Sequence, residues 1–114
     1  RPLVQHAPDR IRIGDVVVDL DAHAAFVDGE PVRCPPRQFS LLATLARRPN
    51  VAFDHEALIA SVWGDRPVDG DPRRLRIAVS LLRGLLGSGP ERPRIETVPR
   101  VGYRLVVGEE RPAA

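Results

Sequence analysis

Apolar residues alternate with polar ones in the first third of the chain, a pattern typical of strands with one covered face. Ile11 and Ile13 alternate with polar or small neighbours, and three more short apolar runs follow before residue 35. Asp28-Gly29, between the last two runs, is a strong hairpin signal because both residue types tolerate positive φ. The pattern predicts a small four-stranded antiparallel meander.

In the middle of the chain the apolar spacing changes to three or four residues, the period of amphipathic helices. The first predicted helix ends at Pro49-Asn50 and has its apolar positions at Phe39, Leu42, Ala43 and Ala46. The second begins at Asp54, a good N-cap, and ends at Gly64. Its predicted buried face consists of Leu58, Ile59, Val62 and Trp63.

The third helix has the clearest start, with Asp71 as N-cap and Pro72 in the first helical position. Its core stripe is formed by Leu75, Val79, Leu82 and Leu86. Two final apolar runs, 94–98 and 103–107, flank a turn and predict a hairpin. The order predicts an α+β winged helix-turn-helix with an N-terminal four-stranded antiparallel sheet, three helices and a C-terminal β-hairpin wing.

The 114 residues are enough for one domain, with 43% hydrophobic and 28% charged residues. We expect a linker remnant over 1–9, the winged-helix domain over 10–107 and a flexible tail over 108–114. The first residue is Arg, so we expect a piece cut from a longer protein. The apolar runs are too short to span a membrane, and we expect a cytoplasmic protein.

Positive charge is concentrated in one third of the chain. Residues 1–72 hold eight Arg against eleven acids, a net of −3, whereas residues 73–104 hold eight Arg against two acids, a net of +6. All 17 basic residues are Arg, for which codon bias is the favoured explanation and a preference for guanidinium groups at phosphates or guanine the alternative. Codon bias does not sort charge along a chain, so the basic third suggests a surface that faces a polyanion.

The Arg residues of the third helix fall opposite its apolar stripe. We expect Arg73, Arg76, Ser80 and Arg83 on one side, with Arg74 beside them. Cations in the first turn oppose the helix dipole at about 0.3–1 kcal/mol each, and a phosphate or base edge would remove that conflict. The alternative is a solvated face that pairs with acids of the loop 64–71.

The hairpin is the second basic element. Arg100 at its tip and Arg104 on its return strand would lie beside a duplex, and a narrow hairpin fits the minor groove. Arg100 would also be explained as an ordinary polar turn residue.

Several motifs resemble the OmpR/PhoB-type response-regulator DNA-binding domain. They are Val32–Leu42, Val62-Trp63-Gly64, Leu82-Arg83, Ile95-Glu96-Thr97-Val98 and Gly102-Tyr103-Arg104-Leu105. The resemblance covers nearly all of residues 10–107 in the correct order. It implies sequence-specific binding of double-stranded DNA, as the effector domain of a bacterial transcription regulator.

The resemblance also implies partners and residue roles. The recognition-helix contacts would be Arg73, Arg76, Ser80 and Arg83, and those of the wing Thr97, Arg100, Tyr103 and Arg104. Trp63 matches a residue whose indole N–H can reach a phosphate, although a core role is equally consistent. Direct repeats bound by a homodimer, contact of the loop 64–71 with RNA polymerase, and an N-terminal receiver or sensor domain are further implications.

The chain departs from the family pattern at several positions. Pro35 and Gln38 stand where an N-cap Thr and a Glu are common, and Pro99-Arg100 replaces Arg-Gly in the wing. In the recognition helix Arg76 replaces an acid, and Leu81 replaces a basic residue. Ile77 and Leu81 would either contact thymine methyl groups or pack under the wing.

The alternative function is a winged-helix protein–protein interaction module with Ile77 and Leu81 as anchors. We expect no enzyme activity, cofactor or metal. The His residues at 6, 23 and 55 show no ligand spacing, and Cys34 is typical of a small buried hydrophobe.

Overall fold

The structure is a computed structural model and describes residues 9–64 and 70–107. The predicted linker remnant over 1–9, except for Asp9, and the predicted tail over 108–114 lie outside these residues. So does most of the predicted loop 64–71, of which only Gly64, Gly70 and Asp71 are described.

The elements follow the predicted order, with one additional short strand. They are β1 (Arg10–Ile13), β2 (Val16–Asp19), β3 (Ala24–Val27), β4 (Glu30–Val32), α1 (Pro36–Arg47), β5 (Phe53–Asp54), α2 (His55–Trp63), α3 (Pro72–Leu86), β6 (Arg94–Val98) and β7 (Gly102–Val106). The predicted α+β class and the order sheet, helices, hairpin are therefore confirmed.

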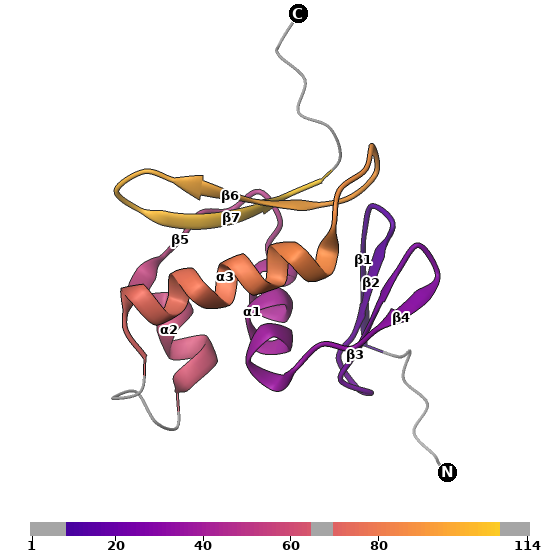
Figure 1. Cartoon of the computed structure of the whole chain (residues 1–114), viewed down its shortest axis with the longest axis horizontal. Coiled ribbons are helices and arrows are strands. Elements are labelled where there is room, and N and C mark those ends of the chain that lie inside the picture. The colour runs from indigo at the N-terminus through magenta and orange to yellow at the C-terminus, as the bar shows by residue number, and fades with distance from the viewer. Residues whose placement is uncertain (1–8, 65–69, 108–114) are drawn as a thin grey trace, which may run out of the picture.

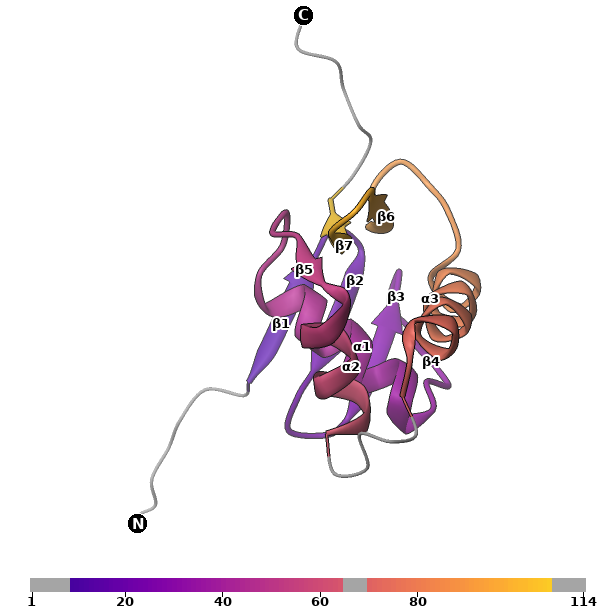
Figure 2. The same ribbon diagram turned by 90° about the vertical axis from the view of Figure 1, so that its left-hand side faces the viewer.

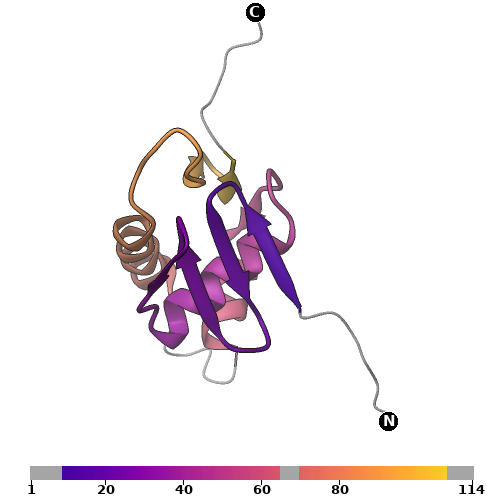
Figure 3. The same ribbon diagram turned by 90° about the vertical axis from the view of Figure 1, so that its right-hand side faces the viewer.

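The first four strands form an antiparallel sheet in the order β1-β2-β3-β4. The β3–β4 turn has positive φ at Asp28 (53°) and Gly29 (81°), as the sequence predicted for this hairpin. Strand β2 ends at Asp19 because its carboxylate accepts a hydrogen bond from the Ala22 N–H at 3.0 Å and begins the turn. One face of the sheet covers α1, as Figure 3 shows.

Two consecutive prolines explain how α1 begins without a side-chain cap. The first four N–H groups of a helix have no partner within the helix. Pro35 at the N-cap and Pro36 at the first position carry no N–H, so only Arg37 and Gln38 retain such a donor. The Phe39 N–H already donates to the Pro35 carbonyl at 2.8 Å.

Side-chain caps set the starts of α2 and α3, as predicted. Asp54 accepts a hydrogen bond from the Ala57 N–H at 2.7 Å, and Asp71 accepts one from the Arg74 N–H at 2.8 Å. A cap of this type stabilises a helix by about 1 kcal/mol.

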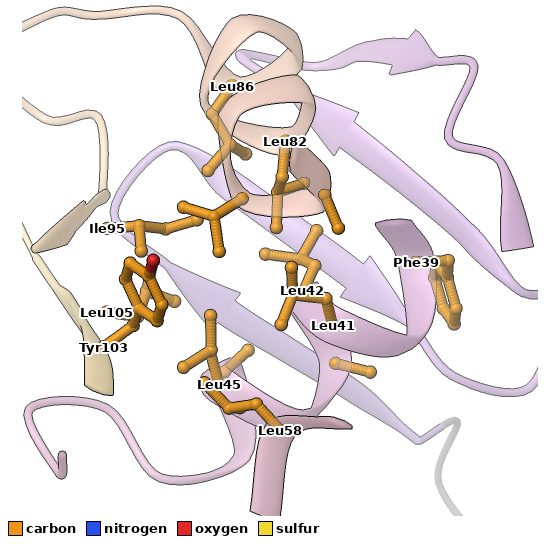
Figure 4. Packing of buried hydrophobic residues seen from close by; sticks show 14 of the residues in the cluster. Phe39, Leu41, Leu42, Leu45, Leu58, Leu82, Leu86, Ile95, Tyr103 and Leu105 are labelled. Carbon is orange, nitrogen blue, oxygen red and sulfur yellow. The ribbon is translucent and has the colours of Figure 1, made fainter. Parts of the chain in front are cut away.

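The core lies where the three helices meet the wing and the β1–β4 sheet. Leu82 and Leu86 of α3 point towards leucines of α1 and towards Ile95 and Leu105 of the wing (Figure 4). The predicted stripe of α3 is buried throughout, and Leu58 of α2 closes the cluster.

The wing is part of a three-stranded sheet in the order β5-β7-β6, whereas the sequence predicted a two-stranded hairpin. The added strand β5 is two residues long and pairs Phe53 with Tyr103 and Asp54 with Gly102. No alternation can develop over two residues, so the pattern carried no signal for it. The extra strand anchors the wing to the start of α2.

The elements leave one side of α3 uncovered. In Figure 1, α3 lies in front of α1 and α2, with the wing above it and the β1–β4 sheet to the right. Figure 2, which looks nearly along α3, shows the helix on the outer side of α1. Among the described elements, none lies over its outward face.

We predict that Gly102→Ala lowers the free energy of unfolding by about 2 kcal/mol, because an added methyl group in a closely packed site destabilises a protein by that order. A Cβ at this position would lie 2.0 Å from the Phe53 carbonyl oxygen. Urea denaturation measures the change. Gly84→Ala is the control, since a Cβ there meets nothing within 4 Å. It should raise stability by about 1 kcal/mol through helix propensity. Unchanged stability of Gly102→Ala would contradict the close approach of β5 and β7.

Candidate nucleic-acid interface

The outward face of α3 begins with three guanidinium groups. Arg73, Arg74 and Arg76 are all exposed and lie in the first turns of the helix. The only carboxylate of the described residues that caps this end is Asp71, and the Arg74 N–H lowers its pKa, with a smaller contribution from Arg73. No acidic residue occupies the first turn, so the cations oppose the helix dipole, as predicted.

Arg83, by contrast, ties α3 to the wing. Its Nε and Nη2 donate to the Ile95 carbonyl at 3.1 and 2.8 Å, and Nη2 also donates to Thr97 Oγ1 at 3.1 Å. The guanidinium lies 5.9 Å from the centre of the Tyr103 ring. Arg83 and Thr97, both predicted to contact DNA, are therefore hydrogen-bonded to each other and position the wing.

Arg104 is also paired within the wing. It donates to Glu96 Oε1 from Nε at 2.9 Å, and Arg94 approaches Glu96 Oε2 at 3.1 Å. The hydrogen bond from Arg104 is the main cause that lowers the pKa of Glu96. Glu96 thus stays ionised and offsets positive charge on this strand pair.

Arg100 is the cation at the wing tip and adopts a conformation that favours glycine. Its φ is 69°, and the residue is exposed. The family pattern Arg-Gly has glycine at this position, so the backbone geometry explains that glycine. An Arg kept there carries strain of about 1 kcal/mol, which is characteristic of functional positions.

Trp63 and Tyr103 lie in the core, with exposed fractions of 3% and 7%. The indole Nε1 of Trp63 is buried and has no hydrogen-bond partner among the described residues. The guanidinium of Arg37 stands 5.5 Å from the centre of the Trp63 ring. Arg37 was not predicted as a site residue, because only the tertiary structure brings the start of α1 beside the end of α2.

The two apolar residues left open by the sequence are solvent-exposed. Ile77 and Leu81 have exposed fractions of 56% and 55%. They line a pocket with Trp63 and Arg37, on the side of the α1 and α2 contacts and not beneath the wing. Packing under the wing is therefore ruled out for both.

The structure thus groups the predicted residues in three ways. Arg73, Arg74, Arg76 and Ser80 lie together on the exposed face of α3, and Arg100 stands at the wing tip. Arg83, Thr97 and Arg104 are engaged in contacts of the wing, and the two aromatic residues, Trp63 and Tyr103, are buried.

Cys34, which the sequence predicted as a small buried hydrophobe, is half-buried, and this burial raises the pKa of its thiol.

Over 9–64 and 70–107, no three His, Cys, Asp or Glu side chains come together as a metal site. Within the same ranges, no helix combines the length and apolar character needed to cross a bilayer.

Curated proteins similar in sequence to this chain include bacterial regulators. The chain is 37% identical over 97 residues to the DNA-binding response regulator MtrA of Mycolicibacterium smegmatis, covering 84% of this chain and 42% of that protein. It is 36% identical over 108 residues to the transcriptional regulatory protein SrrA of Staphylococcus aureus, covering 90% and 43%. The chain therefore spans about two fifths of the length of these relatives.

Solved structures show the same fold. The RstA DNA-binding domain of Klebsiella pneumoniae, crystallised in complex with the RstA box, has a TM-score of 0.72 and 29% identity, covering 86% of this chain and 97% of that chain. The Thermotoga maritima response regulator DrrB, an OmpR/PhoB homologue, has a TM-score of 0.72 and 26% identity, covering 85% and 44%.

The architecture is that of an OmpR/PhoB-type winged-helix effector domain, which confirms the resemblance drawn from the motifs. The chain belongs to the family described as "Transcriptional regulatory protein, C terminal", whose model matches residues 29–105. This is a family of transcription regulators and not a class of enzymes.

We predict that Arg100→Gly raises the free energy of unfolding by up to about 1 kcal/mol, because glycine adopts positive φ without strain. Thermal unfolding followed by circular dichroism measures the change. Arg100→Ala is the control and should leave stability nearly unchanged, since alanine keeps the strained conformation. Equal stability of the two variants would contradict a strained wing tip.

Proposed function

We propose that this chain binds double-stranded DNA sequence-specifically, as the effector domain of a bacterial transcription regulator. The observation that carries the proposal is the exposed cluster Arg73, Arg74 and Arg76 at the start of α3, which the helix dipole alone disfavours. The names of the relatives, "DNA-binding response regulator" among them, support it.

In this proposal α3 enters the major groove. Its 15 residues span about 22 Å, and the groove is wide enough for a helix. We assign Arg73 and Arg74 to phosphates at the groove edge, and Arg76 and Ser80 to base edges. The support is their exposure on the side of α3 opposite the buried stripe.

The wing would lie at the minor groove with Arg100 as the inserted cation. A narrow minor groove has enhanced negative potential, which suits a guanidinium on a thin hairpin. We propose that four residues hold the wing in this position: Arg83, Thr97, Tyr103 and Arg104. Arg83 donates to Thr97 and stands over the Tyr103 ring, and Arg104 pairs with Glu96. For Trp63 we propose a packing role, in keeping with its burial.

We further propose that residues 10–107 form the DNA-binding domain and that this domain acts in the bacterial cytoplasm. A homodimer would bind direct repeats in the DNA. A receiver domain would occupy the N-terminal part of the full-length regulator. This rests on the relatives' name, response regulator, and on the more than half of their length that the match leaves uncovered. Contact of the loop 64–71 with RNA polymerase is proposed from the family resemblance alone.

The test is fluorescence anisotropy with duplex DNA at two salt concentrations, followed by selection of bound sequences from a random pool. We expect binding that weakens with salt, with a log–log slope of about −0.9 per phosphate contact. If no duplex binds at low salt, the DNA proposal fails. That result would favour the alternative function, a protein-interaction module with the exposed Ile77 and Leu81 as anchors.

We predict that Arg76→Ala costs about 1–3 kcal/mol on the selected site and relaxes preference at one base pair. The measurement compares dissociation constants for the selected and a scrambled duplex. Arg12→Ala, which removes an exposed guanidinium from β1, is the charge-matched control. Equal losses on both duplexes would instead make Arg76 a phosphate contact.

We predict that Glu96→Gln strengthens binding to any duplex, because it removes the charge that offsets Arg104. One additional phosphate contact would steepen the salt slope by about 0.9. Titrations of a scrambled duplex at several salt concentrations measure this slope. Glu56→Gln, an exposed acid in the first turn of α2, controls for net charge. Equal gains from the two variants would contradict a specific role of the Glu96–Arg104 pair.

A further inference from the structure

We infer that Ile77 and Leu81 read thymine through its 5-methyl group, so that the domain selects thymine at defined positions of its site. The inference rests on the proposed DNA-binding function and deepens it, because it names the base that the apolar part of α3 recognises.

Both side chains are large, apolar and more than half exposed. Their exposed fractions of 56% and 55% exceed those of the other exposed large hydrophobics in the described chain, Val51, Val101 and Val107. Burying such side chains is favourable, and a helix whose only role was solvation would place polar residues there. Four positions apart, the two lie one turn from each other on the same face of α3.

The pocket that Ile77 and Leu81 line is chemically complementary to the major-groove surface of DNA. It has a volume of about 220 Å³ and is apolar at Trp63 and Ala78. Arg37 and Arg74 also line it, and no carboxylate is among its described lining residues. A lining that combines apolar side chains with two guanidinium groups suits a ligand with both methyl groups and phosphates.

Thymine is the base that offers such a methyl group. In the major groove each base pair presents a distinct pattern, and only thymine adds a C5-methyl to its acceptor. Charge complementarity favours DNA over an apolar protein partner, because the exposed Arg73 and Arg76 precede the pair on the same helix.

The spacing along α3 restricts where the thymines fall. Residues 77 and 81 are separated by about 6 Å along the helix axis. Successive bases on one strand are about 3.4 Å apart, so the two contacts fall within about two base-pair steps. The site should therefore contain a thymine pair in the major groove opposite this part of α3.

The experiment removes single methyl groups from the DNA. After selection of a duplex with the 114-residue chain, each thymidine is replaced in turn by deoxyuridine, which keeps every hydrogen-bonding group. We expect one or two positions at which binding weakens about fourfold, the effect of one apolar carbon transferred from water. This comparison uses the wild-type protein and so does not depend on the folding of a variant.

Variants then assign the methyl to a side chain. In Leu81→Ala, and separately in Ile77→Ala, the thymidine-to-deoxyuridine ratio at one position should fall to about one. Val51→Ala, an exposed apolar residue outside α3, should leave every ratio unchanged. Leu81→Arg should lose the thymine preference and steepen the salt slope by about 0.9.

The outcomes separate this inference from the proposed function. A selected site without thymine preference, or equal affinity for all deoxyuridine duplexes, overturns the inference while DNA binding stands. A methyl effect that persists in both alanine variants overturns it as well. Failure to bind any duplex at low salt overturns the proposed function and, with it, the inference.

Discussion

Burial of the apolar stripe of α3 is the constraint on which the rest of the molecule depends. Leu75, Val79, Leu82 and Leu86 are all at most 3% exposed and contact α1 and the wing. Their packing fixes the rotation of the helix about its own axis, because turning it would expose the stripe. The same rotation carries Arg76 and its neighbours outward, so stability and the presentation of the candidate interface have a common origin.

The wing divides its cations between structure and surface. Arg83 and Arg104 are held by the Ile95 carbonyl, Thr97 and Glu96, which reduces their availability to an incoming ligand. Arg100 at the tip stays exposed in a left-handed conformation that glycine would adopt at less cost. The basic third of the chain is thus less uniform than its net charge suggests. Exposed Arg residues stand at the start of α3 and at the wing tip, whereas the exposed Arg83 is hydrogen-bonded to the wing.

Much of the fold was predictable because its signals are local. The caps Asp54 and Asp71, the Asp28-Gly29 turn and the stripe of α3 each depend on residues within a few positions of one another, and all were confirmed. Strand β5 was not predicted, because two residues carry no period and Phe53 pairs with a strand about fifty positions later. The place of Arg37 over Trp63 likewise depends on contacts between helices distant in sequence.

The sequence by itself determined the fold class, the family and the helix that carries the basic face, since periodicity, capping and motifs are properties of short segments. Only the tertiary structure decided which cations remain exposed and that Ile77 and Leu81 lie clear of the wing. The physical reason is that exposure and pairing depend on neighbours from other elements, which α1, α2 and the wing supply only after the core has packed.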